Sequence, residues 1–206
     1  MWWKLCFLIS LLGFSQLTLA ESCNLGKVDS LHGSATVERA GRIVDVNEGI
    51  VICKGDIYRT DKTSVLQLAF RDVSRITVGK DSVFVVTEYE MYKDKPNVAL
   101  FELIKGAFRA VTGTMTHGSH RYEVKTALAT IGVRGTDFWG GYGLTENGLD
   151  VVMLSGKGVY VTNTQGEMVE LGANGLGTTV LPATAPSTPK IWKDEKVAKA
   201  VATITP

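Results

Sequence analysis

Histidine, the residue most often used in acid–base catalysis and metal binding, is nearly absent from this sequence. Only three histidines occur among 206 residues, and none lies in a recognisable motif. The sequence also lacks a G-x-S-x-G nucleophile motif, an H-E-x-x-H metal motif and a phosphate-binding glycine loop. A catalytic site assembled from distant residues stays open as an alternative. We therefore expect a protein that is not an enzyme and that holds no metal ion and no cofactor.

An excess of charge of one sign is also missing. The full chain carries 22 basic and 21 acidic residues. Because Lys4 is the only charged residue among the first twenty, the remainder holds 21 residues of each sign. A balanced chain has no electrostatic footprint for nucleic acid or for an anionic membrane. We expect no nucleic-acid partner, and a hydrophobic fraction of 45% is ample for a folded core.

Long apolar runs are missing after the first twenty residues. Within those twenty, Lys4 gives a cationic start, residues 5–12 form an apolar run, and Thr18 and Ala20 resemble a cleavage site. This layout is typical of a secretory signal peptide. We expect cleavage of residues 1–20 near Ala20, which leaves a periplasmic or secreted bacterial protein. Because a spanning helix needs about 20 apolar residues, no transmembrane segment is expected in the mature chain. An uncleaved anchor is the alternative.

Cysteine is scarce as well. Cys6 lies in the predicted signal peptide, and only Cys23 and Cys53 follow it. In an oxidising compartment, two cysteines permit one disulfide, which here would tie the mature N-terminus to an early strand. The alternative is a lipid on Cys23, as in lipoproteins, although Glu21 fits that processing pattern poorly.

Proline is rare in the middle of the chain, where glycine is abundant. Of 22 glycines, all except Gly13 lie between residues 26 and 181, whereas only Pro96 of five prolines does. Frequent turns without proline suit a hydrogen-bonded sheet. Residues 65–70 alternate as a strand does, and Ala40-Gly41 resembles a hairpin turn. We expect residues 21–181 to form an all-β domain, built as a two-sheet sandwich, a roll or a solenoid.

The composition changes at Pro182. Three prolines between residues 182 and 189 predict a stiff, extended linker. Trp192 is expected to dock on the β domain, and the alanine- and lysine-rich residues 193–202 favour a short helix. Residues 182–206 are therefore expected to be a proline-rich linker with a short C-terminal tail.

The most informative stretch is residues 126–138, where apolar and β-branched residues surround Gly132 and Gly135. Glycine permits positive φ and close backbone approach, so the pattern predicts a strand, a sharp corner and a second strand. The corner places Arg134 and Thr136 beside a buried surface. A half-buried arginine needs a carboxylate or several carbonyls as partners, so Arg134 is expected to hold the corner. The alternative is that Arg134 receives an anionic ligand.

Two aromatic residues follow this stretch in a glycine-rich segment. The rings of Trp139 and Tyr142 are candidates for stacking on a sugar or on a peptide partner. The alternative is that they cap an edge of the core.

Several segments, taken in order, resemble the FecR domain family. Residues 129–138 are similar to its signature, A-x-x-G-V-R-G-T-x-F, and residues 49–60 resemble a segment that contains Gly-Asp. Residues 64–70, 103–106 and 156–161 are similar to later segments of the family, so the resemblance spans about residues 26–181. The signature residues, which the resemblance suggests are structural, are Gly132, Val133, Arg134, Gly135, Thr136 and Phe138. The sequence departs from the family at Asp72-Val73-Ser74, where Asp-Gly-Ser is usual.

The resemblance implies a compact two-sheet body with solenoid-like stacking and a role in envelope signalling. FecR-type regulators pass a surface signal from an outer-membrane receptor to a sigma factor. They carry a cytoplasmic region and a transmembrane helix before this domain, and here a signal peptide stands in place of both. We therefore expect a non-enzymatic extracytoplasmic module that binds an envelope protein in signalling or assembly. The alternative is a module that binds a cell-envelope glycan, such as peptidoglycan or a polysaccharide.

Overall fold

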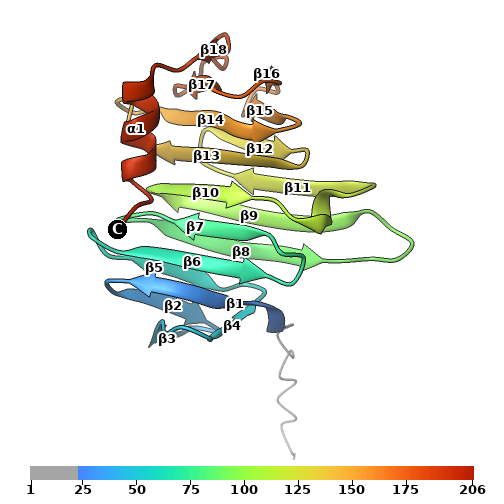
Figure 1. The fold of residues 1–206 in the computed structure, drawn as a ribbon, viewed down its shortest axis with the longest axis vertical. Helices are drawn as coiled ribbons and strands as arrows, with labels where there is room; N and C mark the ends of the chain where they lie inside the picture. Colours follow the sequence, from blue (N-terminus) through green and yellow to red (C-terminus); the bar gives the residue numbers. More distant parts are fainter. Residues whose placement is uncertain (1–22) are drawn as a thin grey trace, which may run out of the picture.

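Residues 23–206 are described by a computed structural model, and the predicted signal peptide at residues 1–20 lies outside them. Two nine-stranded sheets and one short α-helix make up this part of the chain (Figure 1). The sheets face each other, and their strands stack along the long axis of the molecule (Figure 1). The prediction of an all-β, two-sheet fold with a short C-terminal helix is confirmed, and the stacking is solenoid-like.

The strands of each sheet follow one another in a regular order. Sheet A contains, from edge to edge, β18 (Lys190–Ile191), β17 (Leu176–Val180), β14 (Leu149–Gly156), β13 (Thr136–Tyr142), β10 (Ala107–Val111), β7 (Arg75–Val78), β6 (Val65–Phe70), β1 (Cys23–His32) and β4 (Val51–Cys53). Sheet B contains β16 (Met168–Leu171), β15 (Val159–Asn163), β12 (Ala129–Val133), β11 (His120–Lys125), β9 (Asn97–Lys105), β8 (Val83–Glu90), β5 (Ile57–Thr60), β2 (Ala35–Arg39) and β3 (Arg42–Asp45). Neighbouring strands are antiparallel except β9 and β11.

The chain builds the stack by placing successive hairpins alternately in the two sheets. The hairpin β6–β7 lies in sheet A, β8–β9 in sheet B, β13–β14 in sheet A and β15–β16 in sheet B. A 3₁₀ turn, η1 (Thr114–Thr116), lies between β10 and β11. From β5 onward each crossing between sheets is short, and the sequence order of the strands is their order along the stack, whereas β3 and β4 lie outside β2 and β1 at the end of the stack. Both ends of the stack consequently leave strand edges without a neighbour among the described strands.

The core lies between the two sheets and follows from the alternation of side chains along each strand. In β6, Leu66 and Leu68 are fully buried, whereas Gln67 lies on the outer face. A series of aromatic rings runs through the core, with neighbouring centroids 4.8–5.6 Å apart: Tyr89, Phe70, Phe101, Phe84, Phe108 and Phe138. Burial of these rings supplies much of the hydrophobic stabilisation of the fold.

The C-terminal segment covers part of the outer face of sheet A. The helix α1 (Asp194–Ala202) runs across the strands of this sheet (Figure 1). Trp192 precedes it and is 4% exposed, so it docks on the β domain. Its indole ring fits over Gly177, where a Cβ atom would lie 2.3 Å from Trp192 Nε1. Within residues 23–206, no helix is long and apolar enough to cross a membrane.

Two turns show how local sequence sets the backbone. Ala40 and Gly41 have φ values of 49° and 73°, which are typical of the two-residue turn that joins β2 and β3. Val73 joins β6 to β7 at φ 62°, a backbone conformation that a β-branched residue rarely adopts. Val73 therefore adopts the positive-φ conformation that suits the glycine of the usual Asp-Gly-Ser turn, and this conformation is strained for valine.

The first strand is linked covalently to the edge of sheet A. The sulfur atoms of Cys23 and Cys53 lie 2.06 Å apart, which is a disulfide bond length. Cys23 and Cys53 also pair directly across β1 and β4. This arrangement matches the expected link between the mature N-terminus and an early strand.

Candidate functional site

The signature forms the predicted strand, corner and strand. β12 ends at Val133, Gly135 has a φ of +64°, and β13 begins at Thr136. The corner is bound to the turn between β14 and β15, because the Arg134 amide donates to the Gly158 carbonyl at 3.0 Å. Thr136 Oγ1 also accepts a hydrogen bond from the Gly158 amide at 3.1 Å. Backbone groups and the threonine hydroxyl, rather than the arginine head, hold this corner.

The sequence predicts that Arg134 is half-buried and paired, and this prediction is wrong. Its side chain is exposed, and its guanidinium carbon lies 5.2 Å from the centroid of the Tyr160 ring. It forms no ion pair with any residue in the described range 23–206. The side chain faces a hollow of about 390 Å³ on the outer face of sheet B, which is also lined by His120 and Tyr160. The corner directs Arg134 outward because the preceding Val133 occupies the core-facing position.

Trp139 and Tyr142, the predicted stacking residues, are not placed to receive a ligand. Trp139 is fully buried beneath the C-terminal segment, and its indole N–H donates to Thr203 Oγ1 at 3.0 Å. Its ring meets that of Trp192 edge-on, with centroids 6.2 Å apart. Tyr142 packs against the main core. The ligand-contact hypothesis is therefore wrong for Trp139, because residues some fifty positions later in the sequence cover this face of sheet A. Tyr142 is partly buried and is used in packing against the main core, as in the alternative of a ring that caps the core.

Two buried carboxylates, Asp56 and Asp72, accept hydrogen bonds from backbone amides of nearby turns. Asp56 is fully buried and accepts hydrogen bonds from Arg39 Nε at 2.7 Å and from the Tyr58 hydroxyl at 2.9 Å. Asp72 accepts the hydroxyl of Tyr89 in the same way. Burial, together with the adjacent carboxylate, raises the pKa of both tyrosines far above its ordinary value, so both remain donors. Among residues 23–206, no cluster of three or more potential metal ligands occurs.

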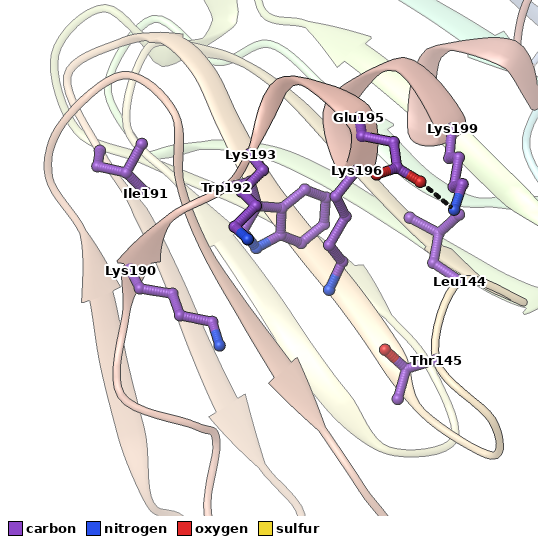
Figure 2. A pocket seen from close by; sticks show the side chains of 9 residues that line it. All are labelled: Leu144, Thr145, Lys190, Ile191, Trp192, Lys193, Glu195, Lys196 and Lys199. Carbon is purple, nitrogen blue, oxygen red and sulfur yellow. Dashed lines mark ion pairs between the residues drawn. The ribbon is translucent and has the colours of Figure 1, made fainter.

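A cleft of about 470 Å³ opens where α1, β18 and the β13–β14 loop meet (Figure 2). Its walls contain Leu144, Thr145, Ile191, Trp192, Glu195 and four lysines, Lys190, Lys193, Lys196 and Lys199. Figure 2 shows Lys190 and Lys196 extending beside the indole of Trp192, with Thr145 across the opening. The sequence does contain a pattern that marks this site, because a lysine occurs at every third position from 190 to 199. The overall balance of charge does not reveal this local cluster.

The strand β3 forms the outermost strand of sheet B at the other end of the stack. All four of its residues are exposed, including Ile43 at 66% and Val44 at 50%. It pairs with β2 on one side, and among residues 23–206 nothing pairs with its other side. Such an edge offers backbone N–H and C=O groups to another strand.

Stacked hairpins in two facing sheets, with a helix docked on one outer face, define an all-β domain whose accessible surfaces are strand edges and sheet faces. The model of the FecR protein family matches residues 56–157, a range that includes the signature corner. This part of the chain is a FecR domain.

Solved structures extend the likeness to the level of the fold. Two crystal structures of a proposed anti-sigma factor from Parabacteroides distasonis ATCC 8503, at 1.65 and 2.50 Å resolution, have TM-scores of 0.54 and 0.55. Both are 16% identical to this chain, and the similarity covers 69% of this chain and 62% of theirs. The chain thus spans less than two thirds of the length of these neighbours. A comparison with curated proteins found no match.

Proposed function

We propose that this protein is a non-enzymatic, extracytoplasmic interaction module of the FecR type, which binds a protein partner in envelope signalling. Family membership and the neighbours described as anti-sigma factors support a role related to signalling. The Cys23–Cys53 pair is compatible with an oxidising compartment, where disulfides persist.

The exposed edge strand β3 is the observation that carries the proposal. An extended segment of the partner would pair with β3 through main-chain hydrogen bonds, with Ile43 and Val44 contributing apolar contacts. Natural edges are commonly blunted by inward-pointing charges, prolines or coverage. β3 has two exposed aliphatic residues at its centre and charged residues, Arg42 and Asp45, only at its ends.

The neighbouring edge strand of sheet A is less suited to strand addition. β4 has three residues, and the Val51 carbonyl already accepts a hydrogen bond from Arg39 Nη2 at 2.7 Å. The Cys53 amide is likewise bound, by Asp56 Oδ2 at 2.8 Å. The glycan alternative rested on Trp139 and Tyr142, and its basis is weakened because Trp139 is fully buried and Tyr142 is partly buried against the main core.

Photocrosslinking in the native envelope tests this proposal. A photoreactive residue at position 44, where Val44 is 50% exposed, should capture a partner, whereas one at position 168, where Met168 is similarly exposed at 60%, should not. Ile43→Lys should abolish capture without lowering the melting temperature, because the lysine would face Glu38 across the β2–β3 pair. Met168→Lys serves as the matched control and should leave capture unchanged.

Hydrogen exchange on the captured complex distinguishes strand addition from a side-chain contact. Amides of β3 that exchange quickly in the free protein should become protected in the complex. Capture that is unaffected by Ile43→Lys would contradict the assignment of this edge. Crosslinks that join only two copies of this chain would replace the proposed partner with a homodimer.

A further inference from the structure

The cleft beside α1 has no role in the proposed protein contact, which lies at the opposite end of the stack. We propose that this cleft binds a compact anion that carries carboxylate or phosphate groups. Its volume of about 470 Å³ falls within the roughly 300–1,000 Å³ typical of small-molecule sites. Four of its nine lining residues are lysines, and Glu195 is the one acid among them.

Two of the four lysines are free to bind an anion. Lys190 and Lys193 form no ion pair with any residue between positions 23 and 206. Lys199 pairs with Glu195 at 2.8 Å, but both side chains are largely exposed, and such surface pairs are weak. An anion in the cleft would therefore meet two unpaired ammonium groups and a third that is loosely held.

The fourth lysine is fixed in place by the fold. Lys196 Nζ lies 2.6 Å from the fully buried Asp150 and 4.1 Å from the centroid of the Trp192 ring. Trp192 is itself held by its contacts with Gly177 and Trp139. The floor of the cleft is thus rigid before any ligand arrives, and this lowers the entropic cost of binding.

The same contacts indicate what kind of ligand fits. Trp192 is only 4% exposed and Lys196 lies over its ring, so little aromatic surface is left for stacking a sugar. β18 has two residues and is too short to seat an added peptide strand. Recognition must then rest on charge, which favours a compact anion, either free or as a substituent of an envelope polymer.

Calorimetric titration tests the site with two probes, inorganic phosphate and an oligosaccharide of glucuronic acid, and with polyglutamate as an acidic peptide for comparison. Whichever probe binds the wild type should bind the double variant Lys190→Gln/Lys193→Gln about tenfold more weakly. This corresponds to a loss of about 1.4 kcal/mol in binding free energy. The matched control, Lys54→Gln/Lys125→Gln, removes two exposed charges that form no ion pair within residues 23–206, and it should not change the affinity. Raising the ionic strength should weaken binding to the wild type.

The outcomes distinguish the possible sources of the anion, and some of them would refute the proposed site. Binding of phosphate supports a free anion, and binding of the oligosaccharide alone supports a charged envelope polymer. Absence of binding by both probes at millimolar concentration would refute the proposal, as would equal weakening in the control variant. Binding of an acidic peptide such as polyglutamate alone would show that the cleft takes a protein instead. None of these results depends on the partner contact at β3.

Discussion

Arg134→Ala is the substitution that most directly tests how the signature works. An arginine that held the corner through a buried ion pair would cost about 3–5 kcal/mol to remove. The structure instead places the guanidinium at the surface, 5.2 Å from the centroid of the Tyr160 ring. An exposed cation–π contact contributes about 0.5–1 kcal/mol. For a domain of this size, that loss corresponds to a fall in melting temperature of about 1–4 °C.

Calorimetric melting of four variants, Arg134→Ala, Tyr160→Leu, their combination and Asp56→Ala, provides the scale for this measurement. Asp56→Ala should be far more damaging, by about 3 kcal/mol, because it leaves the Arg39 guanidinium and the Tyr58 hydroxyl without their buried acceptor. Combining Arg134→Ala with Tyr160→Leu in a double-mutant cycle should give a coupling energy of about 0.5–1 kcal/mol. A loss of about 3 kcal/mol or more for Arg134→Ala alone would refute the surface assignment and restore the arginine as the residue that holds the corner.

Three further changes test other parts of the fold. Val73→Gly should stabilise the protein by about 1 kcal/mol, seen as a higher melting temperature, because it relieves a β-branched residue at φ 62° whose side chain is 70% exposed. Thiol labelling of the denatured, unreduced protein should find neither Cys23 nor Cys53 free, and reduction should cost about 2–4 kcal/mol; two labelled thiols would contradict the disulfide. Trp192→Ala should cost about 3–5 kcal/mol and shift tryptophan fluorescence to longer wavelength as Trp139 meets water; an unchanged spectrum would contradict the docking of the C-terminal segment.

Local patterns in the sequence were enough to predict the strands and the corner. The alternation of Leu66, Leu68 and Phe70 predicts a strand with one buried face, and β6 has this form. Gly135 marks the positive φ between β12 and β13, and Ala40-Gly41 marks the turn between β2 and β3. These features depend on neighbouring residues alone, so they can be recognised without knowledge of the rest of the chain.

The functional surfaces, in contrast, were decided by tertiary structure. A period of two shows that a strand has two faces, but it does not show which face another segment will cover. Trp139 is buried because Trp192 returns to the outer face of sheet A, whereas nothing among the described residues covers Arg134 on the outer face of sheet B. Lys190 and Lys193 likewise become part of a cleft only when α1 docks on sheet A. Burial of a side chain depends on which distant segment packs against it. For these residues, the packing of the two sheets and the C-terminal helix determines which side chains are covered.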